Sequence, residues 1–203
     1  MWDLYKVQPA FVLGFHGCDA DVAASVIAGT EHLNHSNKKH DWLGGGAYFW
    51  EGSPHRAMEW AEDMAQRPST SPNRIRNPAV VGAIIDLRNC CNLFDSSALD
   101  ELKDAWQLFR LTSMRDGASI PVNKGATPDR LGRFRDRAVI EFMHTLRKES
   151  GLYPYDSVRA AFPEGGKLYP GAGFTRRSHI QIAVRNRACI KGYFKPIPQA
   201  AGG

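Results

Sequence analysis

The 203-residue chain alternates between two hydrophobic patterns, and each pattern predicts a different kind of element. Short apolar runs of strand length lie at 11–15, 47–50, 80–87, 180–185 and 190–194. Between these runs, apolar residues recur at the spacing of a buried helix face. The four helical faces are Val22, Ala23, Val26 and Ile27; Ala57, Met58, Trp60, Ala61 and Met64; Ala98, Leu99, Leu102, Ala105, Trp106 and Phe109; and Ala138, Val139, Phe142, Met143 and Leu146. These elements fit one compact domain.

The first strand ends on His16 and Gly17, just before a helix that Asp19 caps and Gly29 ends. The sheet holds an imidazole at a strand end in place, and a neighbouring glycine lets a ligand lie against bare backbone. Two interpretations stay open from this segment alone. His16 is either a ligand-binding residue or a histidine hydrogen-bonded at a strand end before an ordinary helix.

Three glycines at 44–46 lead into the aromatic strand that contains Tyr48, and Ser53-Pro54 begins the next helix. A glycine-rich turn that delivers a tyrosine into a groove suits stacking on a flat heteroaromatic ring, while a core tyrosine is the alternative. The polar stretch before the turn contains His32, His35 and His40. No cysteine or carboxylate frame accompanies these histidines, so the sequence favours a solvated loop over a metal site.

The order of these motifs resembles a known family. His-Gly after a first strand, Gly-x-Tyr-Phe before an alanine-containing helix, and a late strand starting at a polar residue are similar to the diphtheria-toxin-like ADP-ribosyltransferases, which include the poly(ADP-ribose) polymerase catalytic domain. Their signature triad is His, Tyr, Glu. The resemblance spans about residues 11 to 194. It implies an α+β fold with a split β-sheet core and flanking helices, a single domain over 1–203, and NAD as co-substrate.

The resemblance also implies roles for individual residues. His16 would hold the adenosine ribose, Gly17 would offer backbone hydrogen bonds to the nicotinamide carboxamide, and Tyr48 would stack on the nicotinamide. The full set expected to bind NAD is His16, Gly17, Gly46, Tyr48, Arg56, Ala57 and Trp60. The chain departs from the family at two positions. Gln181 stands where the catalytic Glu belongs and supplies no charge, and Arg56 stands where many relatives have a Ser.

The glycine- and proline-rich stretch 162–174 precedes the Gln181 strand, where relatives carry the loop that recognises the acceptor. Its Glu164 is the sole carboxylate between Asp156 and the C-terminus, so it is the candidate for the missing charge or for a base on the nucleophile. A solvated loop glutamate is the alternative. Another stretch, 113–132, is predicted to be a loop that either borders the cleft or lies on the surface.

The formal charge of +5 comes with clusters of basic residues. The clusters are Arg74 and Arg76; Arg130, Arg133, Arg135 and Arg137; and Arg176 and Arg177. Such clusters attract the phosphates of a dinucleotide or of a nucleic acid, although a solvated face has the same composition. Tyr169 and Phe174 could stack on an exposed base. These four acceptor-loop residues, Tyr169, Phe174, Arg176 and Arg177, favour a nucleic-acid acceptor.

Composition limits the remaining classes of protein. With 43% hydrophobic residues the chain can bury one core, and its longest apolar run, at 79–85, is too short to cross a bilayer. The N-terminus lacks the layout of a signal peptide, so a soluble cytoplasmic protein without a membrane partner is expected. Four cysteines, Cys18, Cys90, Cys91 and Cys189, suggest neither a zinc frame nor a disulfide scaffold. We expect reduced, partly buried thiols.

The sequence therefore predicts an NAD-dependent ADP-ribosyltransferase that modifies a macromolecule, with RNA or DNA favoured. A free-standing domain of this size is similar to effector toxins of bacterial toxin-antitoxin or phage-defence systems, so an antitoxin is a further expected partner. Three alternatives stay open: a catalytically silent module that binds ADP-ribose or RNA, a protein-directed mono-ADP-ribosyltransferase, and an RNA 2′-phosphotransferase. The last would need several basic residues to converge on the cleft.

Overall fold

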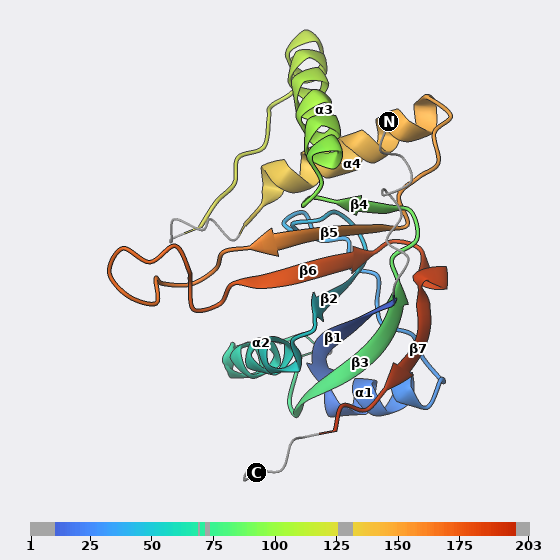
Figure 1. The fold of residues 1–203 in the computed structure, drawn as a ribbon, viewed down its shortest axis with the longest axis vertical. Helices are drawn as coiled ribbons and strands as arrows, with labels where there is room; N and C mark the ends of the chain where they lie inside the picture. Colours follow the sequence, from blue (N-terminus) through green and yellow to red (C-terminus); the bar gives the residue numbers. More distant parts are fainter. Residues whose placement is uncertain (1–10, 69, 72–73, 126–131, 198–203) are drawn as a thin grey trace.

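A computed structural model describes residues 11–68, 70–71, 74–125 and 132–197. The elements follow one another as β1 (Phe11–Asp19), α1 (Ala20–Ile27), β2 (Ala47–Glu51), α2 (Pro54–Gln66), β3 (Pro78–Asp86), β4 (Cys90–Asn92), α3 (Ser96–Arg115), α4 (Phe134–Glu149), β5 (Ser157–Phe162), β6 (His179–Val184), the 3₁₀ turn η2 (Arg187–Cys189) and β7 (Ile190–Phe194). The α+β class expected from the sequence is confirmed (Figure 1).

The strands form a seven-stranded sheet in the order β4-β5-β6-β2-β1-β3-β7. Neighbouring strands are antiparallel except β4 and β5, which are parallel. Strands β4 and β5 lie outside the strand runs expected from the sequence. β4 has only three residues, and Ser157–Arg159 of β5 includes a serine and an arginine, so neither gives a clear apolar signal.

The middle of the sheet is weakly joined. β1 pairs with β3 along its whole length, from Phe11↔Asp86 to Asp19↔Pro78, whereas β1 and β2 share only the pairs Gly14↔Glu51 and Phe15↔Trp50. Beyond Phe15 the two strands separate, and β2 continues alongside β6. We call this separation of β1 from β2 the fork.

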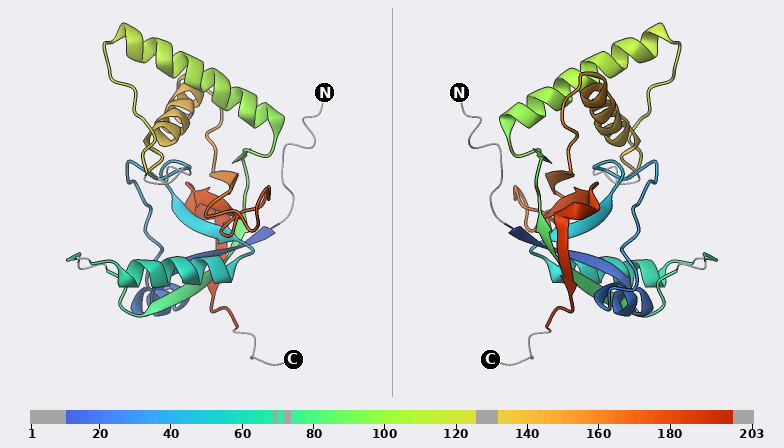
Figure 2. Two further views of the ribbon diagram at one scale, coloured as in Figure 1. Left: turned by 90° about the vertical axis from the view of Figure 1, so that its left-hand side faces the viewer. Right: turned by 90° about the vertical axis from the view of Figure 1, so that its right-hand side faces the viewer.

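The helices lie at two ends of the molecule. Figure 2 shows α3 and α4 together at one end and α1 and α2 at the other, with the sheet between them. The side chains of α3 and α4 pack with Val158, Ala160 and Ala183 of the sheet. Helix α1 contributes Ala23 and Val26 to a second cluster around Phe49, and α2 contributes Ala57 to a third cluster beside Phe15 and Trp50.

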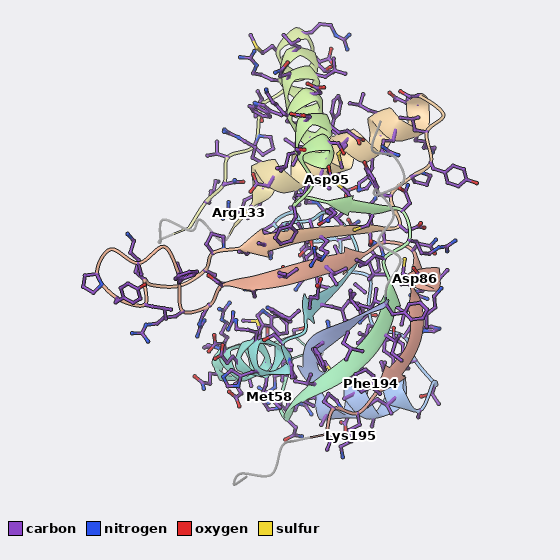
Figure 3. The ribbon with its side chains drawn as sticks, in the orientation of Figure 1. Met58, Asp86, Asp95, Arg133, Phe194 and Lys195 are labelled. Atoms are coloured by element: carbon purple, nitrogen blue, oxygen red, sulfur yellow. The ribbon has the colours of Figure 1, made fainter. Side chains whose placement is uncertain are left out.

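Helix boundaries follow the capping signals in the sequence. The Asp19 side chain accepts a hydrogen bond from the Asp21 backbone N–H at 3.1 Å, and Gly29 ends the first helix with φ +75°. Ser53 caps α2 by accepting from the Arg56 N–H at 3.4 Å. Asp95 and Arg133, which precede α3 and α4, are labelled in Figure 3. Helix α3 continues to Arg115, so it includes the first three residues of the stretch expected to be a loop.

One expectation for α2 is wrong. Trp60, placed on the buried face by its spacing, is 36% exposed, while the buried residues of the helix are Arg56, Ala57 and Ala61. The helix packs so closely on β1 that a Cβ added to Gly17 would lie 2.2 Å from the Ala57 carbonyl oxygen. Only small side chains fit that contact, and the Trp60 indole instead lies 5.7 Å from the Trp50 ring.

Candidate functional site at the fork and the β6 row

His16 spans the fork. Its Nδ1 lies 2.7 Å from the Tyr48 carbonyl oxygen. A carbonyl oxygen only accepts, so Nδ1 is the donor in this hydrogen bond. Burial lowers the pKa of His16, although the bond to Tyr48 opposes that shift. The neutral ring therefore carries its proton on Nδ1 and leaves Nε2 as an acceptor, which is the form that can bind a hydroxyl group.

Tyr48 fixes the glycine turn before β2. Its hydroxyl donates to the Gly44 carbonyl oxygen at 2.7 Å and accepts from the Leu43 N–H at 2.9 Å. Burial raises the pKa of the phenol, so it stays protonated. The ring packs against the cluster formed by α3, α4 and β6. The structure thus brings the Tyr48 backbone to His16 and its phenol to the turn.

The turn itself depends on glycine at two positions. Gly44 has φ +82°, in the left-handed region that favours glycine. Gly46 exchanges backbone hydrogen bonds with Ser36, at 3.0 and 2.9 Å, and a Cβ there would lie 3.0 Å from the Val184 carbonyl oxygen. Glu141 of α4 holds the turn from the other side by accepting from the Gly45 N–H at 2.6 Å. The backbone N–H and C=O of Gly46, a residue expected to bind NAD, are thus occupied by Ser36.

Gln181 belongs to a row of side chains on one face of the sheet. It lies opposite Trp50 on β2 and opposite Ala160 on β5, and His179 lies opposite Phe162. Residues directly opposite one another in an antiparallel pair project to the same face. His179 is close to both aromatic neighbours, with its ring centroid 6.2 Å from Trp50 and 5.8 Å from Phe162. We call Trp50, Phe162, His179 and Gln181 the β6 row.

Three buried polar atoms around this row lack a hydrogen-bond partner among the described residues: Trp50 Nε1, Arg56 Nε and His179 Nε2. His179 Nδ1 donates to the Arg177 carbonyl oxygen at 2.6 Å, and burial, with Arg56 nearby, lowers the pKa of its ring. Its Nε2 is therefore an acceptor, while the other two atoms are donors. Buried polar atoms without partners are rare and call for an explanation such as a ligand or water.

Glu164 reaches this group from the loop between β5 and β6. Its Oε2 lies 3.8 Å from His179 Nδ1 and 3.7 Å from an Arg56 guanidinium nitrogen, and its side chain is 17% exposed. Arg56 also forms an ion pair with Glu59. The structure thus brings Glu164, Arg56 and the β6 row together, so Glu164 is a mostly buried carboxylate and not a solvated one.

His16 and the β6 row lie on different faces of the sheet. Register puts His16 opposite Val81 on the side of Phe49, whose ring lies 5.9 Å away, whereas Phe15 and Gly17 share the side of Trp50. At the fork itself, the hydrogen bond from His16 to the Tyr48 carbonyl oxygen joins the two strands.

The acceptor-loop residues are well exposed. Tyr169 and Phe174 are 58% and 67% exposed, and Arg176 is exposed as well. Arg177 differs because its guanidinium pairs with Asp63 of α2 at 2.9 Å. Figure 1 shows this loop projecting beyond the ends of β5 and β6.

The described arginines of the cluster at 130–137 have local partners. Arg133 pairs with Asp136 at 3.2 Å, Arg135 donates to the Pro121 carbonyl oxygen at 2.9 Å, and Arg137 pairs with Asp41 at 3.6 Å. Arg130, with residues 126–131 of the second loop, lies outside the described residues. The part of that loop that is described contacts α4 through Asn123, whose side chain binds Asp136 at 2.9 Å.

Thiols and possible metal ligands are also located. Cys18, Cys91 and Cys189 are buried and free, and Cys90 is half-buried and free. Within the described residues, no three His, Cys, Asp or Glu side chains gather closely enough to hold a metal ion. No helix in that part of the chain combines the length and apolar composition needed to span a membrane.

Sequence reasoning missed Trp50 and His179. Trp50 falls in an apolar run that predicts a core strand, and His179 lies just before the strand expected at 180–185, so neither was assigned a role. The alternation of β6 does carry a signal, because His179 and Gln181 stand two residues apart and therefore on one face. Comparisons with protein-family models, curated proteins and solved structures found no match to this chain.

Proposed function

We propose that this protein is an ADP-ribosyltransferase that cleaves NAD at the nicotinamide–ribose bond and transfers ADP-ribose to a nucleic acid. In that reaction the C–N bond breaks and nicotinamide leaves with the bonding electrons. A nucleophile of the acceptor then bonds to C1′ of the ribose and loses its proton to a base. The proposal rests on the motif resemblance together with the chemistry of the fork and the β6 row.

The single observation that carries the proposal is the set of unpartnered atoms at Trp50, Arg56 and His179. Two of these atoms donate and one accepts. A ligand that satisfies all three atoms must offer two hydrogen-bond acceptors and one donor. The carboxamide of nicotinamide and the hydroxyls of ribose offer such groups. An unsatisfied buried donor or acceptor costs about 1–3 kcal/mol, so a ligand that satisfies three of them recovers a substantial free energy on binding.

His16 supports the ribose end of the same proposal. Its Nδ1 is bound to Tyr48, so the ring is oriented and Nε2 accepts a hydrogen bond. A ribose hydroxyl is a suitable donor. Gly17 next to it has no side chain, but the Ala57 carbonyl of α2 fills that space, so a contact between Gly17 and the carboxamide rests on the resemblance alone.

Glu164 and Gln181 divide the role of the missing catalytic carboxylate. Gln181 can hydrogen-bond a ribose hydroxyl, and Glu164 supplies a negative charge beside the same row, 3.8 Å from His179. Negative charge near C1′ favours the positive charge that develops as nicotinamide leaves. Once the acceptor nucleophile is in place, the same carboxylate can take its proton.

The acceptor assignment rests on the exposed loop before β6. Tyr169 and Phe174 offer exposed rings for stacking, and Arg176 offers a cation for phosphate. An effector role in a toxin-antitoxin or phage-defence system, with an antitoxin partner, belongs to the proposal through the resemblance alone.

A second candidate function is a silent module that binds ADP-ribose or RNA. One observation favours it: the only carboxylate on the loop lies 3.7 Å from Arg56, which offsets its charge, while Gln181 has none. Release of nicotinamide from carbonyl-labelled NAD separates the two candidates. The transferase requires release that falls when Glu164 is replaced, and it requires the label of adenine-labelled NAD to enter nuclease-sensitive material. Absence of release from a folded protein that binds NAD would establish the silent module.

A further inference from the structure

A cavity of about 710 Å³ lies between α3, α4 and β5, and Phe162 is the one member of the β6 row that lines it. Its walls are mostly apolar and include four aromatic residues. Trp42 and Phe162 contribute rings whose centroids are 4.1 Å apart, and Trp106 contributes a third ring from α3. Small-ligand sites typically measure about 300–1,000 Å³ and combine apolar walls with a few polar groups.

One side of the cavity is the free edge of a strand. β4 pairs only with Ser157, Val158 and Arg159 of β5, so in the described structure residues 160–162 have β6 on one side and no strand on the other. All three of these residues line the cavity. A free strand edge presents backbone N–H and C=O groups, which are the donors and acceptors that the edge of a nucleobase requires.

The charges around the cavity favour an anionic ligand. Lys103 and Arg135 line it, and its one lining carboxylate, Asp136, pairs with Arg133 at 3.2 Å. The Arg133 guanidinium stands 5.0 Å from the Trp42 ring, and its buried Nε has no hydrogen-bond partner among the described residues. Arginine beside an aromatic ring is a common support for a stacked base. Lys103 and Arg135 form no ion pair with any described residue, and two such cations beside aromatic rings suit a base that carries a phosphate.

The cavity adjoins the β6 row. Ala160 lines the cavity and lies opposite Gln181, and Phe162 lines it while its ring lies 5.8 Å from that of His179. A planar group held against these two residues of β5 would be next to the side chains proposed to act on NAD.

We propose that this cavity binds one nucleobase of a single-stranded nucleic-acid acceptor, with the adjoining phosphate held by Lys103 and Arg135. The base lies among Trp42, Phe162 and Trp106 and meets the free edge of β5. The role as an acceptor pocket rests on the proposed function, whereas base binding itself does not.

The test is fluorescence anisotropy of labelled single-stranded oligonucleotides with the full chain, without NAD, using RNA and DNA of the same sequence. Ala160→Trp fills the cavity from the face of β5 that α3 and α4 cover, and Lys103→Glu reverses a charge on the lining. The filling variant should weaken binding about 5- to 150-fold, which corresponds to the roughly 1–3 kcal/mol that a stacked base contributes. Lys103→Glu should weaken binding as well, because it removes a phosphate contact. Lys148→Glu makes the same change of charge at an exposed position on α4 that does not line the cavity, and it should leave binding within about twofold. A preference between RNA and DNA identifies which acceptor is taken.

Leu99→Trp, at an exposed position of the lining, checks the filling effect if Ala160→Trp does not fold. Unchanged affinity in a folded filling variant would overturn the proposal. The proposal would also be overturned if the protein bound no oligonucleotide while an apolar dye or a peptide occupied the cavity. If the wild type does not cleave NAD but the variants lose oligonucleotide binding, base binding in the cavity is supported and the transferase is ruled out. If the wild type cleaves NAD but cavity filling leaves oligonucleotide binding unchanged, the transferase is supported and this inference is ruled out.

Discussion

The His16 ring and the Tyr48 carbonyl are joined by a 2.7 Å hydrogen bond at the point where β1 and β2 separate. The bond sets the tautomer of the imidazole and holds its Nε2 ready to accept. It also means that the backbone of Tyr48, rather than its ring, orients the neighbouring histidine. The orientation of His16 therefore depends on the Tyr48 backbone, while replacement of the Tyr48 side chain tests the hydroxyl and the ring separately.

His16→Ala should weaken NAD binding by about 1–3 kcal/mol, the cost of removing a hydrogen bond in a buried site. Isothermal titration calorimetry with NAD measures this change. His55→Ala is the matched control, because the His55 side chain is 85% exposed on α2. Equal NAD affinity in folded His16→Ala and wild type would remove His16 from the site.

Tyr48→Phe should lower the free energy of unfolding by about 1–3 kcal/mol, because it leaves the Leu43 N–H and the Gly44 carbonyl without their partner. Urea denaturation measures the loss. Tyr153→Phe, at a position 84% exposed, should change stability little. NAD affinity in Tyr48→Phe should stay close to that of wild type, since the ring is retained for stacking. Tyr48→Ala removes the ring and should lower both quantities. A large loss of affinity with unchanged stability in Tyr48→Phe would show that the hydroxyl contacts NAD.

Glu164→Gln should reduce turnover of NAD by about 10²- to 10⁴-fold with little change in NAD affinity, as expected for a lost base or a lost stabilising charge. Glu62→Gln, an exposed change on α2, serves as the control. Gln181→Glu adds a decisive comparison. Suppose that the wild type does not turn over NAD and that Glu164→Gln has no effect. A large gain of NAD cleavage in Gln181→Glu would then identify the natural protein as an inactivated transferase or a binding module.

Stability should fall as the pH is lowered from about 6.5 toward 4. Burial, together with the positive charge of Arg185, lowers the pKa of His144 from 6.5 to about 4. The unfolded chain therefore binds more protons than the folded one in this window, and the free energy of unfolding decreases as the pH falls. His16 and His179, whose pKa values are also lowered, act in the same direction. His144→Phe should flatten the pH dependence measured by urea denaturation at pH 7 and pH 5. An unchanged slope would mean that His144 is protonated without cost in the folded state.

Arg176→Ala should reduce the salt dependence of nucleic-acid binding. Each phosphate contact on a single strand contributes about 0.7 to the slope of log affinity against log salt. Arg177→Ala should have a smaller effect, because Arg177 already pairs with Asp63. Anisotropy titrations across a salt series measure both slopes. If the label transferred from NAD resists nuclease and disappears with protease, the acceptor is a protein.

Local signals predicted much of this fold. Capping residues such as Asp19 and Ser53, and glycines such as Gly29 and Gly44, act through their own backbone, so the sequence alone locates the ends they define. The short strand β4 was not foreseen, because three residues give too little pattern and its pairing with β5 is long-range.

The candidate site was only partly predictable for a related reason. His16, Tyr48 and Gln181 stand in motifs, but the contacts of Glu164 with His179 and Arg56 depend on how a loop folds back over α2. The buried position of Arg56 and the exposure of Trp60 follow from the close approach of Ala57 to Gly17, which no helical periodicity reveals.

The fork divides the sheet into two blocks of strands that are weakly paired with each other. With only two residue pairs between β1 and β2, the block β1-β3-β7 and the block β2-β6-β5-β4 share little backbone hydrogen bonding. A dinucleotide that contacts His16 on β1 and Gln181 on β6 would restrict movement of the two blocks relative to each other, because each block would hold one part of the ligand. Its binding should therefore slow amide hydrogen exchange in both blocks at once, including strands that it never touches.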